Sequence, residues 1–221
     1  MARAAVMRAR DGMRAVWTVW TVWTVWTEWT EWTAPIRRAA FAGSALGLWV
    51  WLSASSPAFA QAPFTLTSKD LDPRQPLSIA QVYDSDGCHG KNQSPELQWS
   101  GAPAGTKSFA ITMFDPDAAG PGWWHWAVTG IPADTHELPT NASASGSLKR
   151  LHAVEASNDF ERPGYGGPCP PPGKPHRYIV TVYALKTTDL RLTPGQPAPM
   201  FDHEIGTTVL GRASITVTYG R

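Results

Sequence analysis

The sequence predicts a mainly β domain, and three observations favour this fold class. Short runs of β-branched and aromatic residues recur after residue 60, and these residue types suit the pleated, half-buried surface of a strand. Clusters of Pro, Gly, Asn and Ser separate the runs and interrupt regular strand pairing. One later segment has its apolar residues at helical spacing.

The expected strands share alternating apolar positions or a high β-branched content. They cover residues 64–67, 77–83, 107–115, 124–131, 177–185 and 213–219. The expected loops between them include the sequences NQSP, SGAPAG, PDAAGPG and PGYGGPCPPPGKP. One helix is expected over residues 200–210, where Phe201, Ile205 and Val209 follow near-helical spacing.

The beginning of the chain differs in composition from the rest. Residues 17–33 repeat tryptophan and threonine with a three-residue period, which matches the burial pattern of neither a helix nor a strand. Residues 1–36 are therefore interpreted as a low-complexity leader that contributes no function. Our hypothesis is that the true start of translation lies downstream of Met1.

Residues 37–60 have the three parts of a secretory signal peptide. Arg37 and Arg38 precede an uncharged apolar run over residues 39–52, and a small-x-small triplet ends at Ala60, after which we expect cleavage. The apolar run is shorter than the roughly 20 residues that span a membrane, so no stable span is expected after cleavage. The paired arginines fit either the general or the twin-arginine export route. An exported domain, periplasmic or secreted, is thus expected over residues 61–221.

The charge of this domain argues against one class of partner. Residues 61–221 carry 13 Lys and Arg against 15 Asp and Glu, without a basic cluster. Binding to a phosphate backbone needs such a cluster, so nucleic acid is not an expected partner. The segment has the usual length of one domain.

Four segments carry closely spaced motifs. They are CHGKNQSPELQW from Cys88, FAITMFDPDAAGPGWWHWAVTGIP from Phe109, NDFERPGYGGPCPPPGKPHRYIVTVYAL from Asn158 and, more weakly, DHEIGTTVLGRASITVTY from Asp202. As a set, they resemble the phosphatidylethanolamine-binding, or Raf-kinase-inhibitor-like, family in its bacterial form. The resemblance implies a central antiparallel sheet, a second smaller sheet and one or two short helices. It also implies a surface pocket for small anionic groups, such as phosphate or a phospholipid head group.

The same resemblance implies the residues of the pocket. It also implies a cis peptide bond between Asp115 and Pro116, which would fix an uncommon turn at the pocket floor. Carried over residue by residue, the ligand-binding positions are Asp115, Asp117, His125, Pro170, Pro171, His176 and Tyr178.

Elementary chemistry gives several of these positions a role. A histidine that becomes cationic attracts an anion, and because its usual pKa is about 6.5, binding should depend on pH. The glycines at 164, 166 and 167 would let backbone N–H groups converge on an anion, which adds Gly167 to the expected site. Asp115 and Asp117 would fix a histidine tautomer or accept the ammonium of a zwitterionic head group.

Strand periodicity predicts the direction of the histidines. In a regular strand, His125 faces away from both Trp124 and Trp126, whereas His176 and Tyr178 share one face.

Cys88 and Cys169 are the two cysteines of the chain. In an oxidising compartment a disulfide is the natural interpretation. Two free thiols or a Cys/His metal site are the alternatives, and the lack of a CxxC motif disfavours zinc.

Binding rather than catalysis is the expected function. The domain has no G-x-S-x-G, phosphate-loop or HExxH motif, and neither a metal nor a cofactor is expected. A hydrolase that uses the histidines and aspartates as acid and base is a less favoured alternative. Inhibition of a protease or kinase through a protein contact is another, which rests on the family name alone.

Overall fold

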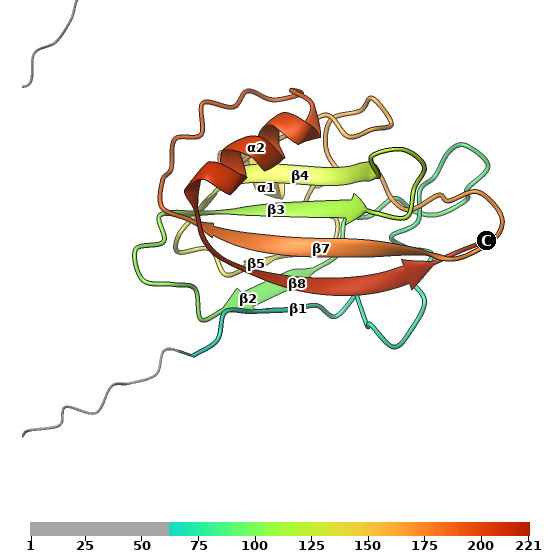
Figure 1. Cartoon of the computed structure of the whole chain (residues 1–221), viewed down its shortest axis with the longest axis horizontal. Coiled ribbons are helices and arrows are strands. Elements are labelled where there is room, and N and C mark those ends of the chain that lie inside the picture. Colours follow the sequence, from blue (N-terminus) through green and yellow to red (C-terminus); the bar gives the residue numbers. More distant parts are fainter. Residues whose placement is uncertain (1–61) are drawn as a thin grey trace, which may run out of the picture. The chain divides into compact units, whose positions relative to one another are not determined.

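The computed structural model describes residues 62–221, which form two antiparallel sheets and two helices (Figure 1). The expected leader over residues 1–36 and the signal peptide over residues 37–60 lie outside the described residues. Within residues 62–221, no helix has the length and apolar character needed to cross a membrane.

The smaller sheet has the order β1-β2-β5. Its strands are β1 (Thr65–Thr67), β2 (Leu97–Ser100) and β5 (Glu137–Leu138). The larger sheet has the order β6-β4-β3-β7-β8. Its strands are β3 (Ser108–Asp115), β4 (Trp123–Pro132), β6 (Val154–Glu155), β7 (His176–Leu185) and β8 (Val209–Tyr219). The predicted fold class, mainly β with a second smaller sheet, is therefore confirmed.

The main core lies between the two sheets. Leu66 and Trp99 of the small sheet pack in one cluster with Phe109 and Val180 of the large sheet. The rings of Trp99 and Phe109 meet edge to face with centroids 5.3 Å apart, a favoured geometry for aromatic pairs. β3 is buried along most of its length because it is the middle strand of the large sheet.

Helix α2 (Ala198–Thr208) covers the other face of the large sheet (Figure 1). Phe201 and Ile205, four residues apart, pack against Ala110 and Ala127. The helix was expected to end at residue 210, but it ends two residues earlier because Val209 already has the extended backbone of β8. A second short helix, α1 (Ser147–Arg150), agrees with the one or two helices that the resemblance implied, but its position was not predicted from the sequence.

The predicted strand over residues 77–83 is wrong. The amide of Gln81 bonds to the carbonyl of Ser78 and forms a turn, and the amide of Tyr83 bonds to the carbonyl of Pro168 in a distant loop. Val82 and Tyr83 are nevertheless fully buried. Their apolar character is explained by burial of a loop rather than by strand pairing.

A partly buried carboxyl on β6 joins three segments. Oε1 of Glu155 accepts hydrogen bonds from Nε1 of Trp126 and from Oγ of Ser143, at 2.8 and 2.6 Å. Burial raises the pKa of Glu155 above its ordinary value, although both hydrogen bonds act in the opposite direction. The folded protein therefore keeps this proton to a higher pH than the unfolded chain does.

This linkage gives a prediction for Glu155→Gln. The protonated carboxyl contributes stability that is full below its unfolded pKa and is lost as the pH rises through the folded pKa. Glutamine can accept both hydrogen bonds and does not titrate. As the pH rises from 4 to 7, the free energy of unfolding of the variant should therefore increase relative to that of the wild type. Urea denaturation of both proteins at each pH measures this difference. A relative loss over that interval would contradict the assignment.

Candidate functional site

The strand order of the large sheet brings the predicted polar residues together. β3 lies between β4 and β7 and runs antiparallel to both, so the end of β3 adjoins the starts of its two neighbours. Asp115 ends β3, His125 is near the start of β4, and His176 begins β7. Residues that are far apart in the sequence thus meet where these three inner strands end on one side of the sheet.

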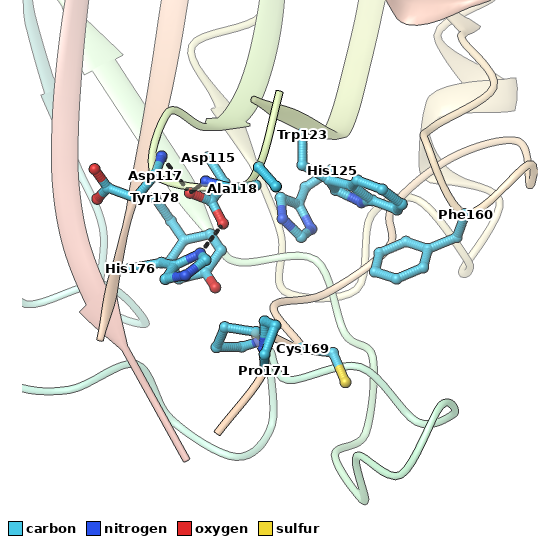
Figure 2. A pocket seen from close by; sticks show the side chains of 12 residues that line it. Asp115, Asp117, Ala118, Trp123, His125, Phe160, Cys169, Pro171, His176 and Tyr178 are labelled. Carbon is cyan, nitrogen blue, oxygen red and sulfur yellow. Dashed lines mark hydrogen bonds and ion pairs between the residues drawn. The ribbon is translucent and has the colours of Figure 1, made fainter. Parts of the chain in front are cut away.

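These residues line a pocket of about 500 Å³ (Figure 2). Every position implied by the family resemblance is among its lining residues, whereas Gly167 is not. The full lining consists of Asp115, Asp117, Ala118, Ala119, Trp123, His125, Phe160, Cys169, Pro170, Pro171, His176 and Tyr178.

Asp115 and His176 form a hydrogen-bonded pair at the base of the pocket. Nδ1 of His176 lies 2.7 Å from Oδ2 of Asp115 (Figure 2). The other carboxylate oxygen, Oδ1, accepts the backbone amides of Asp117 and Ala118. Asp115 is only 3% exposed, so it is held rigidly and orients the imidazole of His176. Asp115 therefore has one of the two roles expected for the aspartates, because it fixes the tautomer of His176.

Asp117 is engaged elsewhere. Its carboxylate accepts hydrogen bonds from Nε, Nη2 and the backbone amide of Arg177, at 2.8 to 2.9 Å. These bonds hold the pKa of Asp117 well below its ordinary value. In Figure 2 the carboxylate points away from His125 and His176. Asp117 therefore contributes to the pocket wall, while its charge is neutralised by Arg177.

Asp115 also explains why the expected cis bond is wrong. The Asp115–Pro116 peptide is trans, as are all peptide bonds in residues 62–221. The two amides that donate to Oδ1 of Asp115 close the turn after β3 through the side chain. The turn thus forms with an ordinary trans peptide.

A β-bulge sets the direction of His125. Met113 pairs with Trp126, whereas Phe114 pairs with Trp124, which leaves His125 as the extra residue of β4. Trp126 packs in the core between the sheets, while Trp124 packs beside α2. His125 meets the ring of Tyr178 with centroids 5.2 Å apart, so it lies on the same side as Trp126. The expected alternation was wrong at this point, because the bulge breaks the two-residue period.

His125 is a buried imidazole rather than a residue at the pocket rim. It is only 2% exposed, and its Nδ1 lies 2.7 Å from the carbonyl oxygen of Gly166. Burial lowers the pKa of His125 to about 4, against the opposing effects of the Gly166 backbone and the charge of Asp115. The ring is therefore neutral at pH 7 in the unliganded protein, and the expectation of a cationic histidine does not hold for His125.

Tyr178 contributes a buried hydroxyl. Its side chain is fully buried, and Oη forms no hydrogen bond of normal geometry with the described residues, although it lies close to the carboxylate of Asp115. Burial, with the negative charge of Asp115, raises the pKa of Tyr178 well above its ordinary value, so the phenol stays protonated. A buried hydroxyl without a partner is uncommon in native proteins and indicates a site that a ligand or water completes.

The expected cradle of glycine amides is wrong. The amide of Gly166 donates to the carbonyl of His125, and the amide of Gly167 donates to Oδ1 of Asn92. The amide of Gly164 is likewise bound within the fold. These glycines stabilise the loop behind the pocket, and their N–H groups are not available to an anion.

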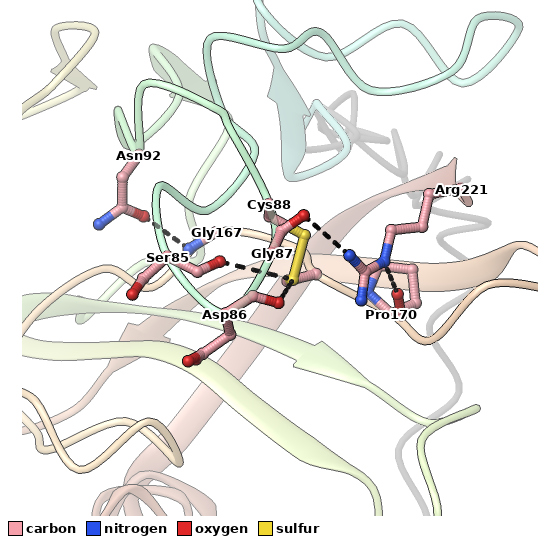
Figure 3. Close-up of a disulfide and its surroundings, with 9 residues drawn as sticks. Ser85, Asp86, Gly87, Cys88, Asn92, Gly167, Pro170 and Arg221 are labelled. Carbon is pink, nitrogen blue, oxygen red and sulfur yellow. Dashed lines mark hydrogen bonds between the residues drawn. A yellow bond between two sulfur atoms is a disulfide. The ribbon is translucent and has the colours of Figure 1, made fainter.

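The loop is fastened by a disulfide between Cys88 and Cys169, as the sequence predicted (Figure 3). Arg221 joins the same two loops, because its Nε donates to the carbonyl of Pro170 and its Nη1 to that of Gly87, at 2.6 and 2.9 Å. Cys169 and Pro170 both line the pocket. The disulfide and Arg221 therefore hold one pocket wall against the rest of the domain.

Gly167→Ala tests the structural role of that glycine. A Cβ at this position would lie 2.1 Å from the carbonyl oxygen of Gln81 and 2.6 Å from the amide nitrogen of Tyr83. Backbone must move to relieve such contacts, and overpacking of this kind costs about 1–3 kcal/mol or more. Thermal unfolding should show a clear loss of stability. A variant as stable as the wild type would show that the loop is looser than described.

Sequence reasoning missed the apolar walls of the pocket. Trp123 and Phe160 form a T-shaped pair with centroids 5.2 Å apart, and both line the pocket together with Ala118 and Ala119. Nothing in the sequence pattern placed Phe160 beside this tryptophan. Its position depends on the long loop before β7.

Comparison with known proteins identifies the family. Residues 63–220 match the family model described as Phosphatidylethanolamine-binding protein. The UPF0098 protein YbcL of Escherichia coli K12 is 42% identical over 161 residues, which cover 72% of this chain and 88% of YbcL. The UPF0098 protein YbhB of the same organism is 39% identical over 155 residues, which cover 70% of this chain and 98% of YbhB. LppC of Mycobacterium tuberculosis, which is named as a putative lipoprotein, is 35% identical over 154 residues, which cover 66% of this chain and 73% of LppC.

The fold agrees with the sequence match. The crystal structure of E. coli YbcL, described as a new member of the mammalian PEBP family, matches with a TM-score of 0.70 at 40% sequence identity. This match covers 72% of the present chain and 99% of the YbcL chain. The chain belongs to the phosphatidylethanolamine-binding protein family.

Proposed function

We propose that the protein is an exported binding protein whose pocket holds the phosphate group of a small ligand, such as phosphate or a phospholipid head group, without catalysing a reaction. The observation that carries this proposal is the partly buried Asp115–His176 pair in an otherwise largely apolar pocket. When His176 is doubly protonated, Nε2 can donate to an anion while Nδ1 stays bound to Asp115. Hydrogen bonds between charged groups are the strong ones.

Two further features support a phosphate site. The hydroxyl of Tyr178 lacks a partner among the described residues and keeps its proton, so it is suited to donate to an anionic oxygen. The walls formed by Trp123, Phe160 and Pro171 keep water from part of the contact, which strengthens hydrogen bonds inside the pocket. A volume of about 500 Å³ is within the usual range for small-molecule sites.

The lining favours binding over catalysis. The Asp115–His176 pair resembles the base and orienting groups of a hydrolase, but the pocket lining contains no serine or threonine, and Cys169 is held in a disulfide. We therefore propose no nucleophilic step.

Export is supported by two independent features. Disulfides persist in oxidising compartments, and the Cys88–Cys169 bond holds a pocket wall. The related LppC carries a lipoprotein name, which is compatible with a location outside the cytoplasm.

Tyr178→Phe tests the proposed binding site with little disturbance of the fold. The change removes one hydroxyl that has no partner in the unliganded protein, so stability should stay within about 0.5 kcal/mol or increase. Binding of inorganic phosphate or phosphoethanolamine should weaken about tenfold, because a hydrogen bond to a charged group is lost. Isothermal titration calorimetry and chemical denaturation measure the two effects. Unchanged affinity in this variant, or no binding by the wild type, would overturn the proposed role.

A further inference from the structure

Once the internal hydrogen bonds of the pocket are assigned, its side chains offer a ligand both donors and acceptors. Nε1 of Trp123 and Oη of Tyr178 are donors without a partner among the described residues. A carbonyl oxygen only accepts, so the 2.7 Å contact with Gly166 places the proton of neutral His125 on Nδ1. The contact between His176 and the ionised carboxylate of Asp115 likewise places a proton on Nδ1 of His176. In both neutral rings Nε2 is therefore an acceptor. No residue in the described part of the chain forms a hydrogen bond with either Nε2 atom.

Several backbone groups around the pocket are not available as donors. The amides of Asp117 and Ala118 donate to Asp115, and the amide of Gly167 donates to Asn92. The prolines at positions 170 and 171 in the pocket wall have no amide proton. A fully deprotonated phosphate placed against His125 would therefore face a nitrogen lone pair and the charge of Asp115.

Burial keeps His125 in its neutral form, although the charge of Asp115 acts in the opposite direction. The pocket places Asp115 from β3 and His176 and Tyr178 from β7 around the ring. The pKa of His125 is about 4, set mainly by burial. The charge of Asp117, the remaining ionisable group of the lining, is paired with Arg177. Between pH 5.5 and 7.5, Nε2 of His125 can thus accept a proton donor of the ligand but cannot donate to it.

We propose, on the basis of the phosphate-binding function above, that the pocket selects phosphomonoesters in their singly protonated form, with the ligand P–OH donating to Nε2 of His125. A phosphomonoester monoanion carries one such proton, whereas a phosphodiester and a sulfate monoester carry none. The remaining anionic oxygens of the ligand accept from Tyr178 and from His176 when it is protonated. Phospholipids whose head group is joined through a phosphodiester are on this basis weaker ligands than phosphomonoesters.

Three small probes of equal charge test the selection. At pH 5.5, methyl phosphate is mainly a monoanion with one P–OH, because the second pKa of a phosphomonoester is about 6. Methyl sulfate has nearly the same shape and the same charge but no proton, and dimethyl phosphate is the corresponding diester. None of the probes contains an amine that could supply a different donor. Calorimetric titration of the protein with each probe at pH 5.5 and 7.5 measures the preference directly.

At pH 5.5, methyl phosphate should bind at least about tenfold more tightly than the other two probes. The difference is the effect of one additional hydrogen bond to a charged ligand. The affinity of methyl phosphate should fall about tenfold or more by pH 7.5, as the monoanion disappears. Equal affinity for all three probes at pH 5.5 would overturn the inference and leave the proposed phosphate site intact. Absence of binding by every probe would overturn both.

His125→Gln provides a matched variant. A glutamine amide can direct an N–H donor to the region of Nε2 without needing a proton from the ligand. The preference for methyl phosphate over methyl sulfate should then fall to less than about threefold at pH 5.5. His203→Ala, on the exposed surface of α2, should keep the wild-type preference. Retention of the full preference by His125→Gln, with a native circular dichroism spectrum, would contradict the role of His125.

Discussion

Replacing His176 with alanine should weaken phosphate binding about 100-fold. The variant loses the Nε2 donor that a protonated His176 offers to the ligand, and a hydrogen bond between charged groups contributes about 1.5–3 kcal/mol. It also leaves Oδ2 of Asp115 without its partner at 2.7 Å. The unpaired carboxylate, which is only 3% exposed, would then repel an anion in the pocket.

The same change should lower stability by about 1–3 kcal/mol, the cost of leaving a buried polar group unsatisfied. Affinity is measured by calorimetry with inorganic phosphate, and stability by urea denaturation. His203→Ala, an exposed histidine outside the pocket, is the matched control and should change neither quantity. If His176→Ala bound phosphate as tightly as this control, the Asp115–His176 pair would have no part in recognition.

Removing the disulfide should have the largest effect on stability. The Cys88–Cys169 bond closes a loop with a sequence separation of 81, and the chain-entropy model for a loop of this size gives about 4 kcal/mol. The double variant Cys88→Ser with Cys169→Ser should therefore unfold at a much lower urea concentration than the wild type. Chemical reduction of the wild-type protein should have the same effect.

The disulfide also has a consequence for binding. Because Cys169 lines the pocket next to Pro170 and Pro171, the double variant should bind phosphate more weakly even under conditions in which it remains folded. Arg221 would still join the carbonyls of Pro170 and Gly87, so partial binding should survive. A midpoint of denaturation equal to that of the wild type would show that the bond adds no net stability.

The long strands of the large sheet could be predicted from the sequence because their residues are both β-branched and buried. Residues 107–115 and 177–185 nearly coincide with β3 and β7. The segment over residues 77–83 has a similar composition, but its buried residues are fixed by loop contacts that depend on the fold. Strands as short as β5 and β6 have too few residues to produce a periodic signal.

The identity of the pocket residues could be predicted from the family motifs, but their physical state could not. His125 was expected to become charged near neutral pH, whereas the bulge in β4 places it in the buried layer, where burial keeps it neutral. Gly167 was expected to offer its amide to a ligand, yet Asn92 accepts that hydrogen bond. Burial and hydrogen-bond partners depend on contacts between distant segments, which no local pattern contains.

The histidines therefore have different proposed roles in one site. His176 has the carboxylate of Asp115 as a partner and can hold a second proton beside an anion. His125 is buried, with the carbonyl of Gly166 on one nitrogen and a free acceptor on the other side of the ring. Because His176 can donate to the ligand while Nε2 of His125 can only accept, the proposed site prefers a protonated phosphomonoester over other anions.

The most direct test of the proposed site is a ¹H–¹⁵N NMR titration of the histidine side chains with methyl phosphate at pH 5.5. The ring nitrogens of His125 and His176 should shift together and saturate at one ligand per protein, while those of the exposed His203 remain unchanged. The ¹⁵N chemical shift of Nε2 in His125 should change in the way typical of an unprotonated ring nitrogen that accepts a hydrogen bond. Saturable binding without shifts at His125 and His176 would place the ligand elsewhere and contradict the account.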